Sequence, residues 1–202
     1  MLQLGLHLSL SKRKKLPVIH VDGVEYSFPI WQYKQARFIS KTGLCLDTVG
    51  VAWFLNEFDF YSFPEIGDLT ILDIGAGCGE TAWKFLDDGA KSVIAIECDP
   101  KRFHMLQQNV VKLGMPVLPV GEPFQIEHLS RFNYDLIKCD VEGYEMLLVE
   151  YGGVLKPCIV EVHTNWIRDR FIDHGFRIMA TIYNELAGVG VYLMNNFGWY
   201  VK

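Results

Sequence analysis

The stretch from residue 69 to residue 88 constrains the fold most, because a strand, a glycine-rich loop and a helix follow one another there without a break. The apolar run at 69–74 has the length of a buried strand, and residues 80–88 are predicted to be helical. Between them the chain reads Gly-Ala-Gly-Cys-Gly at 75–79. Glycines at the entrance to a helix let the backbone approach a ligand closely and expose amide donors, so the sequence predicts a ligand site at this loop.

Strands and helices keep alternating after this loop. Apolar runs predict further strands at 92–97, 117–120, 134–139, 158–162, 176–182 and 189–194, with helices at 100–113 and 165–174 between them. Asp99 is placed to cap the helix at 100–113, Pro100 suits its first turn, and Gly114 suits its end. The alternation predicts an α/β fold in which a parallel sheet carries helices on both faces.

The composition excludes several classes of protein. Of the 202 residues, 50% are hydrophobic, so the chain can bury a sizeable core and is not a disordered chain. The formal net charge of −5 argues against a protein that holds nucleic acid by phosphate contacts alone. No apolar run approaches the ~20 residues of a membrane span. The five cysteines have no CxxC spacing, which indicates reduced thiols in a cytoplasmic protein and neither a disulfide framework nor a zinc site.

Residues 1–62 are expected to form an extension to the main domain at 63–202. Leucines alternate with other residues over 2–10, and Asp22-Gly23 lies between alternating apolar residues as in a two-residue hairpin turn. We therefore expect a β-meander over 2–28, followed by a helical stretch over 31–59. Because the leucine strand has an apolar face that must be covered, the extension is expected to shape the entrance of the site or to form a homodimer through its strands.

Two acids flank the glycine loop. Asp73 precedes the glycines, where its charge would repel a phosphate, and the loop has G-x-G-x-G spacing in place of the G-x-G-x-x-G of dinucleotide sites. Glu97 ends the next predicted strand, 20 residues after Gly77, where an acid can hold both hydroxyls of a ribose. The residues therefore favour a ligand that has a ribose and no phosphates.

At these residues the chain resembles the class I S-adenosylmethionine-dependent methyltransferases. The resemblance covers about 69–202 and implies a Rossmann-like, seven-stranded, mostly parallel sheet that ends in an antiparallel hairpin, with S-adenosylmethionine as the cofactor. In that family the acid after the second strand grips the ribose, and the adenine is held after the third strand, where Glu122 is either its acceptor or an ordinary surface acid. The cofactor-binding residues that the resemblance implies are Asp73, Gly75, Gly77, Gly79, Glu97, Glu122 and Asp140.

The ends of the fourth and fifth predicted strands resemble one branch of this family, the FkbM-type methyltransferases, which are mainly O-methyltransferases. The resemblance rests on Lys-Cys-Asp-Val-Glu-Gly-Tyr-Glu at 138–145 and on Glu-Val-His at 161–163. Three residues depart from that pattern: Cys139 replaces an aliphatic residue, Tyr144 a small one, and Gly77 an asparagine. The branch implies a small-molecule acceptor, and Tyr144 is expected to narrow its pocket.

Four polar side chains gather at these two strand ends: Asp140, Glu142, Glu161 and His163. Each pair is two residues apart, so each pair shares one side of its strand, and neighbouring parallel strands lie ~4.8 Å apart. Three roles are open for these four residues. In the first, Asp140 contacts the methionine amine and orients the acceptor while His163 is the general base. In the second, the four bind a hard cation such as Mg²⁺. In the third, Glu142 caps a helix and His163 is a half-buried structural histidine. We assign catalysis to His163 and Asp140 and predict no metal.

The sequence thus predicts an S-adenosylmethionine-dependent methyltransferase that methylates a hydroxyl of a small molecule or sugar. One alternative is an RNA methyltransferase that uses the basic residues at 12–15, although nucleic acid is not the expected partner. Another is a non-catalytic protein that binds S-adenosylmethionine. Methylation of a base amino group is not expected, because the fourth strand ends Asp-Val-Glu-Gly and lacks the two prolines of that enzyme class.

Overall fold

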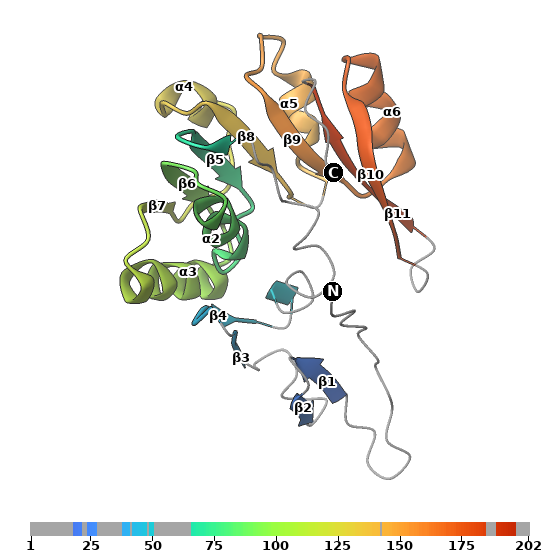
Figure 1. The fold of residues 1–202 in the computed structure, drawn as a ribbon. Coiled ribbons are helices and arrows are strands. Elements are labelled where there is room, and N and C mark those ends of the chain that lie inside the picture. The colour runs from blue at the N-terminus through green and yellow to red at the C-terminus, as the bar shows by residue number, and fades with distance from the viewer. Residues whose placement is uncertain are drawn as a thin grey trace.

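The main feature of the fold is one seven-stranded sheet in the order β10-β11-β9-β8-β5-β6-β7 (Figure 1). The computed structural model describes residues 18–21, 24–27, 38–40, 42–47, 49–50, 66–141, 143–184 and 189–196. The five parallel strands are β5 (Thr70–Ile74), β6 (Ser92–Ile96), β7 (Val117–Val120), β8 (Leu136–Cys139) and β9 (Cys158–Val162). Strand β11 (Val189–Asn195) pairs antiparallel with both β9 and β10 (Arg177–Asn184), and this final hairpin completes the sheet. This confirms the predicted mostly parallel, Rossmann-like sheet with a final hairpin.

Helices cover both faces of this sheet. On one face, α2 (Glu80–Asp87) and α3 (Pro100–Leu113) pack Phe85 and Leu106 against strand residues such as Ile71, all three fully buried. On the other face lie α4 (His128–Arg131), α5 (Met146–Glu150) and α6 (Asn165–Asp173), which contribute Leu129, Leu148 and Phe171. The strands β5, β6, β8 and β9 are buried between these layers and are mostly apolar, whereas β7 at the edge of the sheet is partly exposed.

The predicted ends of α3 are confirmed. The side chain of Asp99 accepts hydrogen bonds from the backbone N–H groups of Lys101 and Arg102, both at 2.9 Å. Gly114 ends the helix with φ 62°, the left-handed conformation that glycine adopts without cost. Two short helices, α4 and α5, were not predicted, because one turn of helix has too few residues to show a hydrophobic period.

The prediction of a helical stretch over 31–59 is wrong for residues 38–46. Strands β3 (Phe38–Ile39) and β4 (Cys45–Leu46) pair there as an antiparallel hairpin. The turn between them places Gly43 at φ 88°, where the amide of Gly43 bonds the carbonyl of Ser40, and a left-handed residue stops a helix. The helical conformation is present at 49–50, where Asp47 caps the N–H groups of Val49 and Gly50.

The hairpin predicted around residues 22–23 is confirmed. Strands β1 (Val18–Val21) and β2 (Val24–Ser27) pair antiparallel, and Val21 faces Val24 as a two-residue loop requires. The predicted leucine strand at 2–10 and the domain boundary at 62–63 lie outside the described residues, so the expected homodimer through that strand stays a prediction. None of the helices in the described ranges combines the length and the apolar character needed to cross a membrane.

Candidate functional site

The glycine loop bends the chain sharply where β5 ends. Gly75 has φ 79°, and a Cβ atom on it would lie 1.8 Å from the carbonyl oxygen of Asp140. The amides of Gly75 and Ala76 both bond the carbonyl oxygen of Ile96, at 3.0 Å. The loop is thus packed between the ends of β6 and β8. Only glycine fits at position 75, because a side chain there would overlap the backbone of the neighbouring strand end.

The other two glycines of the loop are also in the left-handed region. Gly77 has φ 56°, and a Cβ on it would come 2.7 Å from Glu80 Oε1. Gly79 has φ 93° and lies directly before α2, with a hypothetical Cβ 2.8 Å from Leu106 Cδ1. Close packing on both sides of the loop explains these glycines without a ligand, so their direct contact with a cofactor stays a prediction.

Asp73 is fully buried beneath the loop. Thr81 Oγ1 donates a hydrogen bond to Asp73 Oδ2 at 2.5 Å, and Lys138 Nζ lies 3.1 Å from Asp73 Oδ1. Lys138 Nζ also donates to the carbonyl oxygen of Gly75 at 2.8 Å. Although burial opposes its charge, the carboxylates of Asp73 and Asp140 raise the pKa of Lys138. Asp73 therefore stabilises the loop through Lys138 and Thr81, and its own contact with the cofactor stays a prediction.

Glu97 follows β6 and faces the glycine loop. Its Oε2 accepts a hydrogen bond from the amide of Gly77 at 2.9 Å, and its Oε1 accepts one from the amide of Asp99 at 2.7 Å. The side chain is buried, and these two bonds fix its orientation. Each carboxylate oxygen has two lone pairs, so both can still accept a hydrogen bond from a ligand hydroxyl.

Glu80 opens α2 and was not identified from the sequence. Its Oε2 accepts a hydrogen bond from the amide of Cys78 at 2.8 Å, and its carboxyl group is next to Gly50, where a Cβ would lie 3.0 Å from Oε1. Burial, with a contribution from the charge of Asp47, raises the pKa of Glu80 to about 7. The first residue of α2 is therefore an acid whose pKa lies near neutral pH.

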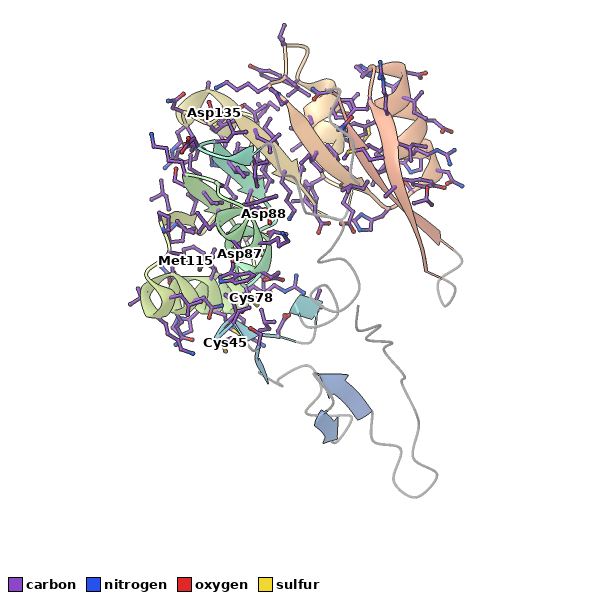
Figure 2. The ribbon with its side chains drawn as sticks, in the orientation of Figure 1. Cys45, Cys78, Asp87, Asp88, Met115 and Asp135 are labelled. Carbon is purple, nitrogen blue, oxygen red and sulfur yellow. The ribbon has the colours of Figure 1, made fainter. Side chains whose placement is uncertain are left out.

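Asn109 joins the glycine loop to the hairpin of β3 and β4. It is fully buried on α3, and its amide nitrogen donates to the carbonyl oxygens of Cys78 at 2.7 Å and Cys45 at 2.8 Å. Its Oδ1 accepts from the amide of Cys45 at 2.8 Å. Figure 2 shows Cys45 and Cys78 close together beside this helix. The segment that contains β4 is therefore held directly against the candidate site.

Glu122 follows β7 and belongs to a small polar cluster. Its Oε1 lies 2.6 Å from Arg131 Nη1 and 3.0 Å from His128 Nε2. The Nδ1 of His128 accepts from the amide of Gln125, so in the neutral ring the proton is on Nε2, which donates to Glu122. The hydrogen bond from His128, followed by that from Arg131, lowers the pKa of Glu122. Glu122 is thus a fixed, ionised acceptor, and its contact with an adenine stays a prediction.

Asp140, Glu161 and His163 come together at the ends of β8 and β9. His163 Nε2 lies 3.2 Å from Glu161 Oε1 and 3.8 Å from Asp140 Oδ1. The predicted gathering of these three is therefore present, whereas Glu142 lies outside the described residues. A general base needs a ring nitrogen that can reach the acceptor. In His163 Nδ1 is buried and Nε2 faces two carboxylates, and its predicted role as that base stays a prediction.

Sequence reasoning missed the buried groups that support the site. Lys138 lies opposite Asp73 because of the register between β5 and β8, which the sequence alone does not reveal. The hydrogen bonds between Asn109 and Cys45 join residues 64 positions apart in the sequence. The one available signal was Lys138 itself, because a lysine inside an apolar strand requires a buried partner.

No protein-family model matches the chain. Over 73 residues the chain is 42% identical to a tRNA U34 carboxymethyltransferase from Cellvibrio japonicus. That match covers 34% of this chain and 23% of the relative, so the chain spans less than a quarter of the relative's length.

Solved structures resemble the chain over most of its length. The tRNA m1G37 methyltransferase of M. jannaschii has a TM-score of 0.56 at 13% identity, covering 94% of this chain and 58% of that one. TYW2 of M. jannaschii, in complex with AdoMet, has a TM-score of 0.53 at 15% identity, covering 92% and 87%. At these identities the likeness shows a shared fold.

Proposed function

We propose that this chain, which has the fold of the class I S-adenosylmethionine-dependent methyltransferases, transfers a methyl group from S-adenosylmethionine to a hydroxyl oxygen of a small molecule or sugar. The observation that carries the proposal is the hydrogen bond from the amide of Gly77, in the glycine loop, to the carboxylate of Glu97, which fixes the orientation of that carboxylate. The strand ends 138–145 and 161–163 support placing it in the FkbM-type branch, whose members are mainly O-methyltransferases.

The acidic residues beside the glycine loop and after β7 suit the cofactor. Glu97 offers lone pairs on both oxygens to two neighbouring ribose hydroxyls, and Glu122 offers an ionised acceptor after β7. The acidic side chains favour a ligand without phosphates that carries positive charge. When bound, S-adenosylmethionine supplies an electrophilic methyl group on a sulfonium. The chain's own contribution is to hold that group against the ends of β8 and β9.

The acceptor belongs at the strand ends that carry Asp140, because ligands of open α/β sheets bind outside the carboxyl ends of the strands. The Asp140 side chain is 23% exposed and can orient an acceptor hydroxyl. The transfer forms a bond between the hydroxyl oxygen and the methyl carbon and breaks the bond from that carbon to sulfur. The electron pair stays on sulfur as a neutral thioether, and the hydroxyl proton is released.

The test is a screen of acceptors with methyl-labelled S-adenosylmethionine and the full chain. We expect label in an oxygen-methylated product, with turnover reduced about 10²-fold or more in Asp140→Ala. A full chain that binds S-adenosylhomocysteine but labels no hydroxyl compound would overturn the acceptor class and leave a protein that only binds the cofactor.

RNA is the second candidate acceptor. The match to a tRNA carboxymethyltransferase over 73 residues favours it, and so do the basic residues at 12–15. Salt separates the two candidates. Binding to RNA releases counterions, so the affinity of an RNA enzyme for its substrate falls by orders of magnitude between about 50 and 200 mM salt. Turnover on a neutral hydroxyl compound changes little over that range.

A further inference from the structure

Three potential metal ligands converge at the ends of β8 and β9. Cys139 pairs with Val160 in the parallel register, so Asp140 lies beside Glu161 on the next strand. His163 follows Glu161 by two residues and shares its side. One ligand atom from each of the three side chains lies within 4.8 Å of the other two. The arrangement follows from strand register, which makes it a property of the rigid sheet.

The distances suit one bound ion. Ligand atoms held about 2.1 Å from a cation lie about 3.0 to 3.4 Å apart when they subtend a right or tetrahedral angle. The Nε2 of His163 is 3.2 Å from Glu161 Oε1, within that range, and 3.8 Å from Asp140 Oδ1, which needs a small side-chain movement. Glu161 is 5% exposed, and the side chains of His163 and Asp140 are 22% and 23% exposed. Glu161 is thus held in the protein interior, whereas His163 and Asp140 are partly exposed to solvent. Water or an acceptor can therefore complete the coordination of the ion.

The ligand set also indicates which ions fit. Two carboxylates and one imidazole suit a divalent ion between the hard and soft classes, such as Mn²⁺, Fe²⁺ or Zn²⁺. Cys139 is not part of the ligand group, because its side chain is fully buried in the hydrophobic core. The buried cation near this cluster, Lys138, lies 3.1 Å from Asp73 and donates a hydrogen bond to the carbonyl oxygen of Gly75.

We propose that Asp140, Glu161 and His163 bind a divalent cation of this class at the ends of β8 and β9. Binding of the ion does not depend on the proposed function, but its role does: the ion coordinates the acceptor hydroxyl and lowers its pKa, so the proton passes to solvent water before the oxygen reacts. This assigns His163 as a ligand in place of the predicted general base.

The test is a titration of the full chain with Mn²⁺, followed by loss of the electron paramagnetic resonance signal of free Mn²⁺. Mn²⁺ is a suitable probe because it has little affinity for the exposed thiol of Cys98. We expect saturable binding of one ion per chain. Asp140→Asn and His163→Gln should each weaken it about tenfold or more, and Zn²⁺ should displace the bound Mn²⁺. Glu150→Gln, which changes an exposed carboxylate on α5, should leave the affinity unchanged.

Two results would overturn the proposal: no saturable binding of Mn²⁺ or Zn²⁺, or equal affinity in the wild type and both cluster variants. Asp140 is part-exposed, so Asp140→Asn is the variant least able to disturb folding, and circular dichroism checks it. A parallel titration with S-adenosylhomocysteine separates the two hypotheses. If the chain binds S-adenosylhomocysteine and no metal, the metal site fails and the proposed function stands. If the chain binds metal and no S-adenosylhomocysteine, the proposed function alone is overturned.

Discussion

The carbonyl oxygen of Asp140 lies against the α-carbon of Gly75, so close that a Cβ there would be 1.8 Å away. This contact joins the loop after β5 to the end of β8, and Lys138 strengthens the joint by bonding the carbonyl of Gly75. The loop proposed to hold the methyl donor and the strand end proposed to hold the acceptor are therefore one packed unit. A methyl transfer needs this, because its rate depends on holding two reactants at a fixed separation.

Gly75→Ala should destabilise the protein far more than alanine at a comparable glycine. Gly175 is the matched control, since it has φ 84° against 79° for Gly75 and nothing within 4 Å of its hypothetical Cβ. Left-handed backbone alone costs about 1 kcal/mol in Gly175→Ala, and the overlap with Asp140 adds about 3 kcal/mol or more in Gly75→Ala. Urea unfolding of both variants measures the difference, and equal losses would show that the close packing at Gly75 is not real.

Lys138→Met should lower the free energy of unfolding by about 3 to 5 kcal/mol, because it leaves the buried carboxylate of Asp73 without its counter-charge. The double variant Asp73→Asn/Lys138→Met removes both charges and should recover much of that loss. Both groups are at most 2% exposed, so solvent does little to screen the pair. Denaturant unfolding of the two single variants and the double variant gives the coupling energy. A coupling near zero would contradict the assignment of Lys138 as the partner of Asp73.

Glu80 should make stability fall as pH rises toward neutral. Burial raises its pKa in the folded protein to about 7 from the usual 4.5, so the folded state binds the proton more tightly than the unfolded state. Its stabilising contribution is fully present below pH 4.5 and is lost as pH rises through about 7. The free energy of unfolding of Glu80→Gln relative to wild type should therefore increase by about 2 kcal/mol between pH 5 and pH 8. Urea unfolding at the two pH values measures this, and a pH-independent difference would contradict the raised pKa.

Much of the sheet could be predicted because each buried parallel strand is a mostly apolar run, and because α3 has its own start and stop residues. Asp99 and Gly114 set the ends of α3 through local bonds and backbone conformation, which the sequence displays directly. The segment at 38–46 was mispredicted, since strands of two residues carry no periodic pattern and β4 is held by hydrogen bonds to Asn109 of α3.

The candidate site was predictable in its position but less so in the roles of its residues. Asp140, Glu161 and His163 could be grouped because parallel strand ends lie at one edge of the sheet. The bonds of Asp73 to Thr81 and Lys138 could not be foreseen, because they depend on which face of β5 is buried and on the register with β8. The orientation of the imidazole of His163 likewise depends on neighbours from another strand.

The most direct test of the account is a calorimetric titration of the full chain with S-adenosylhomocysteine, compared with NAD. Wild type should bind S-adenosylhomocysteine in the micromolar range and NAD not at all. Because hydrogen bonds to a charged group contribute about 1.5 to 3 kcal/mol, Glu97→Ala should bind roughly 10- to 100-fold more weakly. Glu150→Ala, a change to an exposed acid on α5, should bind like wild type. Binding of NAD together with no response to S-adenosylhomocysteine would contradict the account.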